Sequence, residues 1–478
     1  MGMGKKYYCI AAILWWSALV QAQPFAADTS EAASRPVVFN QYYSTPFVMG
    51  EIYVEGNKHT KAYIIQRELP FKTGDSIYLT DLVDGFEIAR QQLFNTGLFN
   101  EVVVSLKSFR GYHVDVLISV KERWYIFPIP YIKPVDRNLA EWAKQGYGID
   151  RLNYGFKFTH HNFSGRNDKL RMWLITGYTR QIQFQYEQPF ADRSLKHGYR
   201  FGFMYSSNKE VNYKTVDNQQ VFVDSLGFGL RQWTAHADWL YRPGLRTFNS
   251  VRFAMTNVRV DTAIINLNPH YLSGGKSSIT YPEISYKVNY VKVDYVHFPL
   301  KGWMGEASFV KRGFNKDMNL WELSGSFTKA WELSKKNYLS FQAYGVLRLP
   351  FDQPFVNHRL FGYGTLYLRG LEKYVIDGTA AFMSRQTYRR ELVRFSVPTF
   401  LKSTSHDKIP FRIYARTFAD LGYAYNKSFN DNSLVNRPLC TAGFGVDIVT
   451  FYDLILRIDY SFNQLGQNGL FLHIKNDL

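Results

Sequence analysis

The sequence predicts a mainly β protein, in which a transmembrane β-barrel follows one small α+β domain. Tyr, Phe and Trp make up 17% of the 478 residues, yet the mean hydropathy is only −0.26. Segments after Glu122 alternate apolar with polar residues, as strands do when one face meets lipid and the other lines a wet lumen. The stretch before Glu122 instead combines short strands with helical spacing. A soluble β-sandwich, the alternative, would turn apolar residues inward, whereas the second face of these strands carries Gln, Glu, Lys and Ser.

Residues 1–22 are predicted to be a secretory signal peptide. Lys5 and Lys6 precede an apolar run from Ile10 to Val20, and Val20-Gln21-Ala22 forms a small-residue cleavage site. The run is about eleven residues long, against the roughly 20 that span a bilayer, which disfavours the alternative of an uncleaved anchor. Residues 23–47 are then a linker.

Residues 48–121 are predicted to form the α+β domain. A strand at Glu51–Glu55 is followed by a short helix at Thr60–Leu69, which Pro70 ends. Thr80 is the expected N-cap of a second helix. Apolar residues three and four positions apart form one face of that helix: Leu79, Leu82, Phe86, Ala89 and Leu93. Strands at residues 101–107 and 112–120 complete the order β-α-α-β-β.

Residues 122–478 are predicted to form the barrel. In residues 181–187, apolar side chains alternate with Gln and Glu, which places the apolar set toward lipid and the polar set inside. The same alternation runs through residues 284–290, 321–328 and 339–343. Turn signals rich in Gly, Asn and Asp, such as residues 164–168, separate these runs as the loops of a meander would.

Three later segments carry a resemblance to a known family. They are Leu368-Arg369-Gly370-Leu371, Phe418-Ala419-Asp420-Leu421-Gly422 and Gly469-Leu470-Phe471-Leu472-His473-Ile474. Together with Asn95-Thr96-Gly97-Leu98-Phe99 and residues 162–168, they resemble the BamA/TamA superfamily of outer-membrane assembly and transport barrels, of the bacterial surface antigen type. The resemblance identifies residues 48–121 as a single polypeptide-transport-associated (POTRA) domain. It also implies a 16-stranded antiparallel transmembrane β-barrel for residues 122–478, and the length of that part permits it.

The resemblance implies that the loop around Arg369 folds back into the lumen. A guanidinium placed there needs a carboxylate to offset its desolvation. Asp420, close to Gly422 on a late strand, is the expected partner, with Glu391 as the alternative or a second partner. Leu371 departs from the family motif, which usually has an aromatic residue there. The other possibility is a surface-loop arginine with no partner.

The first predicted strand, Arg123–Ile132, contains two prolines two positions apart, which remove two N–H donors from the same edge. In the family, the first and last strands meet at a seam that is proposed to open sideways and to let a client strand pair with the exposed edge. If the prolines face this seam, the missing hydrogen bonds weaken it. They could equally mark the linker into the barrel or face the second strand. The residues expected along the seam are Tyr125, Pro128, Pro130, Leu470, Phe471 and His473.

No catalytic, cofactor or metal signature stands out. Gly275-Lys276-Ser277 lacks the earlier glycine of a phosphate loop, since His270 occupies that position. His160 and His161 point to opposite faces of a strand and cannot share a metal. The net charge of +17 comes from scattered basic residues. This distribution favours contact with anionic lipid headgroups or lipopolysaccharide over nucleic acid.

The sequence therefore leads us to expect an outer-membrane protein that assists insertion or assembly of other barrels, or translocation of exported proteins, with its POTRA domain in the periplasm. The expected partners are unfolded outer-membrane or exported client proteins, outer-membrane lipids and lipopolysaccharide, and accessory periplasmic or lipoprotein subunits. The alternative is a passive pore or surface-exposed barrel with a periplasmic anchor domain. A soluble periplasmic binder of lipid or sugar is disfavoured by the polar inner faces of the strands.

Overall fold

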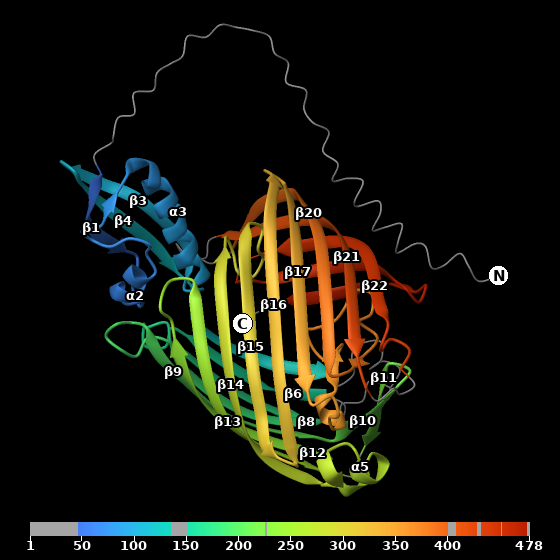
Figure 1. The fold of residues 1–478 in the computed structure, drawn as a ribbon. Coiled ribbons are helices and arrows are strands. Elements are labelled where there is room, and N and C mark those ends of the chain that lie inside the picture. Colours follow the sequence, from blue (N-terminus) through green and yellow to red (C-terminus); the bar gives the residue numbers. More distant parts are fainter. Residues whose placement is uncertain are drawn as a thin grey trace, which may run out of the picture.

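The computed structural model describes residues 46–134, 152–224, 227–399, 408–427, 432–450 and 452–475. The predicted signal peptide, residues 1–22, and nearly all of the predicted linker lie outside these ranges. Two parts follow one another in the chain, a small N-terminal α+β domain and a large antiparallel sheet that curls into a barrel (Figure 1).

The N-terminal domain is a four-stranded sheet packed against two helices. Its strands lie in the order β2-β1-β4-β3, with β1 parallel to β4 and the other neighbours antiparallel. Its elements are β1 (Phe47–Glu55), α2 (Ala62–Arg67), β2 (Ser76–Ile77), α3 (Leu79–Asn95), β3 (Phe99–Arg110) and β4 (His113–Glu122). The helices contribute their apolar faces to the core, where Ile65 of α2 and Leu93 of α3 are fully buried. The domain therefore has a hydrophobic core of its own, separate from the barrel.

The structure of this domain differs from the sequence prediction at two points. The second helix begins at Leu79, after Tyr78, and no side chain caps it. Thr80 lies inside the first turn, where its hydroxyl donates to Asp81 Oδ1 (3.4 Å). The sequence also gives no sign of β2, because a strand of two residues is too short to show a period.

In the part of the chain that the structure describes, sixteen antiparallel strands form the barrel wall, in sequence order apart from small hairpins inserted between them. They are β5 (Ile126–Pro134), β6 (Leu152–His161), β7 (Lys169–Gly177), β8 (Thr179–Gln188), β9 (His197–Asn208), β12 (Leu230–Tyr241), β13 (Thr247–Val260), β14 (Ser278–Val293), β15 (Gly302–Asn315), β16 (Met318–Ser334), β17 (Asn337–Leu349), β20 (Ala380–Pro398), β21 (Lys408–Tyr425), β22 (Pro438–Val449), β23 (Ile455–Asn463) and β24 (Asn468–Lys475). The predicted fold class is confirmed, including the number of strands that the family resemblance implied.

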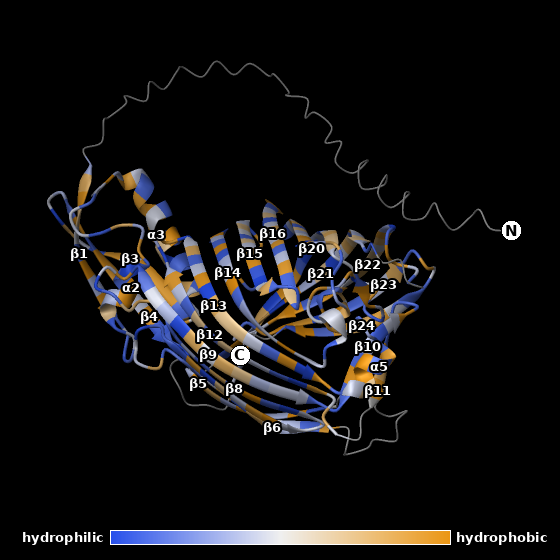
Figure 2. Ribbon diagram, turned by 60° about the horizontal axis from the view of Figure 1, so that its bottom comes forward, coloured by the Kyte–Doolittle hydropathy of each residue, from blue (hydrophilic) through white to orange (hydrophobic). Residues whose placement is uncertain are grey.

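Alternation along the strands sorts side chains between the outside of the barrel and the lumen. Ile182 and Leu323 are 51% and 56% exposed on the outside, whereas Ser340 and Asp420, which face inward, are 4% and 0% exposed. Apolar and polar colours alternate along the strands in Figure 2. The barrel wall thus has an apolar outer surface and a polar inner surface, as expected for contact with lipid.

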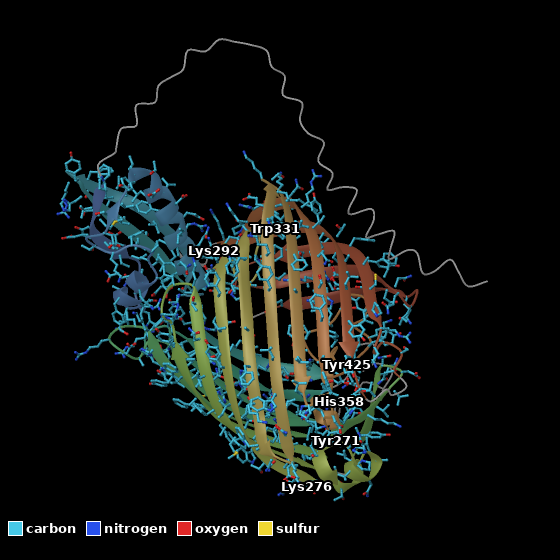
Figure 3. All side chains as sticks on the ribbon, viewed as in Figure 1. Tyr271, Lys276, Lys292, Trp331, His358 and Tyr425 are labelled. Carbon is cyan, nitrogen blue, oxygen red and sulfur yellow. The ribbon has the colours of Figure 1, made fainter. Side chains whose placement is uncertain are left out.

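The two ends of the barrel differ. We call the end that carries the N-terminal domain the near end. It includes residues 294–301, between β14 and β15. The far end carries longer insertions (Figure 1). In Figure 3, Lys292 and Trp331 lie toward the near end, and Tyr271 and Lys276 lie at the far end. The far-end insertions contain β10 (Glu210–Val216), β11 (Gln219–Asp224), α5 (Thr262–Leu267), η2 (Ser273–Gly275), η3 (Phe355–Asn357), β18 (Arg359–Phe361) and β19 (Ile376–Asp377). No helix in the described ranges is both long and apolar enough to cross a membrane.

Candidate functional site: the lumen loop and the seam

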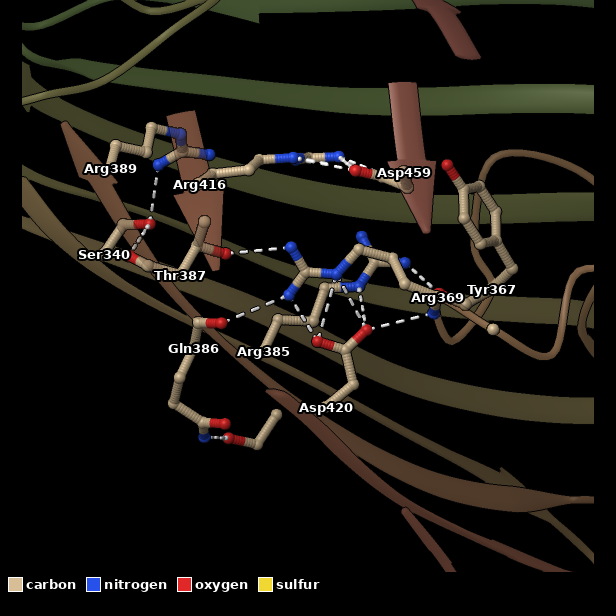
Figure 4. Close-up of polar contacts among 12 residues, drawn as sticks. Ser340, Tyr367, Arg369, Arg385, Gln386, Thr387, Arg389, Arg416, Asp420 and Asp459 are labelled. Carbon is tan, nitrogen blue, oxygen red and sulfur yellow. Dashed lines mark hydrogen bonds and ion pairs between the residues drawn. The ribbon is translucent and has the colours of Figure 1, made fainter. Parts of the chain in front are cut away.

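The loop between β18 and β19, residues 362–375, folds back against the inner wall and brings Arg369 to Asp420 of β21 (Figure 4). The Arg369 backbone N–H donates to Asp420 Oδ2 (3.0 Å), and Nε lies 3.0 and 3.1 Å from the two carboxylate oxygens. Nη2 also donates to Asp420. The side chains are 8% and 0% exposed. Because the guanidinium and the carboxylate are both removed from water, each depends on the other for compensation of its charge.

The remaining groups around Arg369 complete its environment. Its Nη1 donates to Thr387 Oγ1 (2.9 Å), and the Gln386 carbonyl accepts a hydrogen bond from Nη2 (3.3 Å). The guanidinium carbon lies 4.1 Å from the centroid of the Phe418 ring. The guanidinium therefore has acceptors along its edge and an aromatic ring on its face, an arrangement that lysine could not reproduce.

The residues beside Arg369 fix the path of the loop. Leu368 and Leu371 are buried in one apolar cluster with Met383 of β20. Gly370 has a φ of +92°, which favours glycine. Gly422 leaves the space that Leu368 occupies, since a Cβ at position 422 would lie 2.9 Å from Leu368 Cδ2. The structure thus brings Leu368, Arg369, Gly370, Leu371, Asp420 and Gly422 together at one place on the inner wall.

Glu391 does not reach Arg369. Its carboxylate accepts hydrogen bonds from Arg394 Nη2 (2.9 Å) and from the Tyr414 hydroxyl (3.1 Å). The cause is strand register, because Arg385 is the β20 residue opposite Asp420, and Glu391 lies further along β20 toward the near end. The expectation of Glu391 as a partner is therefore corrected. The second charged neighbour of Asp420 is Arg385, whose Nε lies 3.8 Å from Asp420 Oδ2.

Two further carboxylates lie on the same inner wall, and the sequence analysis does not single them out. Asp447 of β22 and Asp459 of β23 are both fully buried. Arg416 contacts both, with its Nη1 3.3 Å from Asp447 Oδ1, and Arg389 Nε donates to Asp447 Oδ2 (3.0 Å). The alternation of inward-facing and outward-facing residues along a strand could have identified them, because each occupies an inward-facing position of its strand.

The lumen loop also contacts the last hairpin of the barrel. Asn463 Nδ2, at the end of β23, donates to the Gly370 carbonyl (2.8 Å), and the Tyr374 hydroxyl donates to Gln467 Oε1 (2.9 Å). His473 of β24 stacks on Tyr367 with ring centroids 4.9 Å apart. Its Nε2 also lies 3.4 Å from Glu372 Oε1. The inner side of the last strand therefore rests on the loop that Arg369 anchors.

The first and last strands, β5 and β24, are the two edges of the 16-stranded sheet. Within the residues that the structure describes, no backbone ladder joins them. The His161 N–H donates to the Tyr125 carbonyl (2.8 Å), so residues of the same parity as Tyr125 point their backbone groups toward β6. Pro128, Pro130 and Pro134 have the opposite parity, and their missing N–H groups therefore fall on the seam side of β5.

The other residues predicted to lie along the seam do not all lie there. Tyr125 precedes β5, and its hydroxyl donates to the Leu98 carbonyl (3.0 Å) and lies 3.1 Å from Thr60 Oγ1, so it belongs to the junction with the N-terminal domain. This corrects the seam assignment of Tyr125. On β24, Leu470 is 72% exposed on the outside, whereas Phe471 lies opposite the buried Asp459 and shares its inward face.

Comparisons with known proteins bear on the N-terminal domain first. Residues 47–123 match the family model for POTRA, described as surface antigen variable number repeat. This segment is a POTRA domain. With the 16-stranded sheet, the match confirms the architecture that the resemblance to the BamA/TamA superfamily implied. No curated protein sequence matches the chain.

Several solved structures are similar at low identity. BamA from Haemophilus ducreyi lacking POTRA domains 1–3 shares 15% identity over 90% of this chain and 84% of that chain, with a TM-score of 0.48. CdiB from Acinetobacter baumannii shares 11% identity over 90% and 73%, with a TM-score of 0.48. CdiB from Escherichia coli shares 11% identity over 97% and 95%, with a TM-score of 0.45. These values leave the function to be argued from the chain's own geometry.

The POTRA domain docks on the near-end turns through buried charges. Glu68, at the end of α2, is 1% exposed, and its carboxylate accepts from Arg242 Nη2 (2.7 Å) and from Nη1. Arg67 Nε donates to the Leu195 carbonyl (2.8 Å). Burial and the nearby charge of Arg242 lower the pKa of Arg67 to about 10, so it stays protonated at neutral pH. Breaking this contact would leave a buried charge without its partner.

The turn between β6 and β7 supplies a second docking point for the POTRA domain. The Lys61 N–H donates to the Gly165 carbonyl (2.9 Å), and Asn162 Nδ2 donates to Thr60 Oγ1 (2.9 Å). Gly165 has a φ of +82°, and a Cβ there would lie 2.4 Å from the His59 carbonyl oxygen. Residues 162–168, which contribute to the family resemblance, therefore act in this chain as a seat for the POTRA domain.

The described residues also offer no grouping suited to a metal. No three His, Cys, Asp or Glu side chains in these ranges lie close enough together to hold one. Lys276, from the segment that resembles part of a phosphate loop, pairs with Asp317 at the far end (2.7 Å). The lumen loop, the inner wall and the seam therefore form the candidate functional site.

Proposed function

We propose that this chain is an outer-membrane protein of the BamA/TamA type, which assists the insertion and assembly of outer-membrane proteins or the translocation of exported ones. The near end, with the POTRA domain, then faces the periplasm. The observation that carries the proposal is the seam, because in the described residues no ladder joins the two edge strands and one of them lacks three N–H donors. A seam of this kind favours exchange with an incoming strand.

The backbone donors and acceptors of the two edge strands explain why a client strand would be preferred at β24. The Asn463 N–H donates to the Gln467 carbonyl, so Leu470, Leu472 and Ile474 direct their backbone groups away from β23 and toward the seam. These residues offer a full set of donors and acceptors. β5 cannot return the same number of hydrogen bonds, each of which contributes about 0.5–1.5 kcal/mol net. A client strand without prolines can, and so it would pair with β24 more strongly than β5 could.

The lumen loop would hold the wall steady while the seam exchanges partners. Arg369 and Asp420 tie the loop to β21, and Asn463 and His473 bring the last hairpin against the same loop. We propose Leu368, Arg369, Gly370 and Leu371 as the anchor, and Asp420 and Gly422 as its seat. Such an anchor allows β24 to lose its neighbour across the seam without losing its support from inside.

The POTRA domain has an edge of its own for a client strand. β3 is 12 residues long and, among the strands that the structure describes, pairs with β4 alone, which leaves its other edge unpaired within the described residues. Val103 and Phe109 on this strand are 46% and 48% exposed. We propose that clients add to this edge before they reach the seam, which follows a recognised mode of peptide binding. Anionic lipids or lipopolysaccharide and accessory periplasmic or lipoprotein subunits are further proposed partners.

Depletion of the protein followed by outer-membrane proteomics tests this function. A broad loss of barrels supports an insertase, and loss of one class of protein supports a dedicated exporter. An unchanged outer membrane would contradict both. The alternative, a passive pore, is disfavoured because the Arg369 loop and the apolar contacts of the near-end turn occupy part of the lumen. Steady single-channel conductance of the purified chain would favour it.

A further inference from the structure

The β14–β15 turn, residues 294–301, crosses the near end of the barrel from the side opposite the seam. Counted from β24, the strands β15 and β14 stand eighth and ninth of sixteen, so their turn starts opposite the gap between β24 and β5. Tyr295, Phe298 and Leu300 of the turn belong to one buried apolar cluster with Tyr338 of β17 and with residues of β21 to β23. The partners on β21 to β23 are Tyr414, Val449 and Ile455.

Individual contacts show how the turn is seated. The Phe298 ring lies 5.1 Å from the ring of Tyr414, centroid to centroid, and the Arg389 guanidinium carbon lies 4.9 Å from the Phe298 centroid. Phe298 is 2% exposed and Leu300 is 7% exposed. This aromatic side chain is deeply buried against β20 and β21, three and four strands along the sheet from β15, and moving it would expose its apolar surface.

Asp453, in the turn between β22 and β23, joins this closure to the seam. Its carboxylate accepts a hydrogen bond from the Tyr295 hydroxyl and pairs with Arg123, whose Nη1 lies 2.7 Å from Asp453 Oδ2. Arg123 lies three residues before the first strand of the barrel. The Trp124 N–H also donates to the Tyr452 hydroxyl (3.3 Å). One buried carboxylate thus connects the start of β5, the last strands and the crossing turn.

The POTRA helix α3 holds the crossing turn from the other side. Asn95 Nδ2 donates to the Val293 carbonyl (3.2 Å), and the Val296 N–H donates to Asn95 Oδ1 (3.1 Å). The rings of Phe94 and Tyr295 lie 5.6 Å apart, centroid to centroid. The C-terminal end of α3 therefore bonds to the turn directly, and movement of the helix is transmitted to it.

We propose that residues 294–301 form a plug that closes the near end of the lumen, and that Asp453 couples this plug to the seam, so that displacement of α3 releases both together. Because Arg123 and Tyr295 share one buried carboxylate, the loss of one contact weakens the other. The packing of the turn against the inner wall follows from the contacts alone. Its use in admitting clients rests on the proposed function.

Planar-bilayer conductance of the purified full chain tests the plug without any client. Asp453→Asn and, separately, Phe298→Ala should raise the open fraction by at least about tenfold over the unmodified chain, because each removes a contact that seats the turn. Asp317→Asn is the matched control, since Asp317 also forms an ion pair, with Lys276, but at the far end and 37% exposed. Heat-modified gel mobility checks that each variant folds. Folded variants that stay as closed as the control would overturn the proposal.

A reversible tether separates the plug from the proposed function. Asn95→Cys with Val296→Cys, in a Cys440→Ser background, joins α3 to the turn when oxidised. We expect the oxidised chain to remain closed and to insert no clients in proteoliposomes. The reduced chain should open and insert clients again. Full insertion by the oxidised chain would overturn the plug as a gate and leave the proposed function intact. A reduced chain that opens but never inserts clients would support the plug and contradict the proposed function.

Discussion

At the scale of single residues, the Arg369–Asp420 pair carries the anchoring of the lumen loop. Arg369→Ala would leave Asp420 buried without its main partner, which typically costs about 3–5 kcal/mol. We expect the barrel to unfold at a lower urea concentration and to insert clients more slowly. Denaturation followed by gel mobility, with an insertion assay in proteoliposomes, measures both effects.

The matched control for Arg369 is Arg394. This arginine also pairs with a carboxylate, that of Glu391, but its side chain is 62% exposed. Arg394 lies largely in water, and Tyr414 still donates to the buried Glu391 when the arginine is removed, so Arg394→Ala should cost less than Arg369→Ala. Arg369→Lys should fall between the two, because it keeps the charge but loses the two-pronged geometry. Equal stability of the Arg369→Ala and Arg394→Ala variants would show that the loop pair does not anchor the fold.

The charge of Asp453 leads us to expect that closure of the near end by the β14–β15 turn depends on pH. Burial alone would raise the pKa of Asp453, but the hydrogen bond and charge of Arg123, together with His297 and Tyr295, outweigh it and lower this pKa. The contribution of the carboxylate to closure is therefore complete above the usual aspartate pKa of about 3.9 and is lost as the pH falls through the lower folded value. Conductance measured from neutral pH downward should rise below about pH 4. Asp453→Asn should lack this rise, and a parallel rise in both proteins would assign it to other groups.

The sequence identifies only some of the residues that form the candidate site. Asp420 is identified from its motif in the sequence, and the structure places it against Arg369. Glu391 has the right charge and the wrong position, because register along β20 decides which side chain faces Asp420. Alternation along the strands could place Asp447 and Asp459 on the inner face, but their arginine partners and the Asp453 junction depend on which strands and turns meet in the fold. No local pattern in the chain carries that pairing.

At the scale of elements, the seam side of β5 is the feature with the clearest consequence. Restoring two N–H donors with Pro128→Val and Pro130→Val should strengthen pairing between β5 and β24. We expect client insertion to slow severalfold, because each regained hydrogen bond contributes about 0.5–1.5 kcal/mol to the closed seam. Pro438→Val, at the start of β22 and away from the seam, is the control. Insertion at the control rate would argue against the seam as the site of exchange.

Periodicity predicts the elements of the barrel well and those of its ends poorly. Residues 181–187 and 321–328 alternate over whole strands, and the structure places Ile182 and Leu323 on the outside. β2 and the far-end strands β18 and β19 have two or three residues each, too few to show a period. Thr80 is not the N-cap of α3, because a capping residue type marks a helix start only when its side chain reaches the backbone.

At the scale of the whole molecule, the buried pair between Glu68 and Arg242 ties the POTRA domain to the barrel. Glu68→Gln would leave Arg242 without its charge partner and should loosen the docking. Hydrogen exchange of residues 60–70 and 242–246 should then become faster. Glu87→Gln is the matched control, since Glu87 pairs with Arg90 on the exposed face of α3 (2.7 Å). Unchanged exchange at both segments would mean that other contacts hold the domain.

The central claim is that the barrel has one unpaired line, between its first and last strands, at which client strands exchange. Hydrogen exchange of the full chain in membrane vesicles tests it most directly, by comparing residues 124–131 and 470–474 with residues 321–328 of β16. The account predicts that the seam-facing amides of these segments, such as those of Leu470, Leu472 and Ile474, exchange much faster than those of β16, and that added client protein slows exchange at residues 470–474. Edge segments as protected as β16, with or without client, would contradict it.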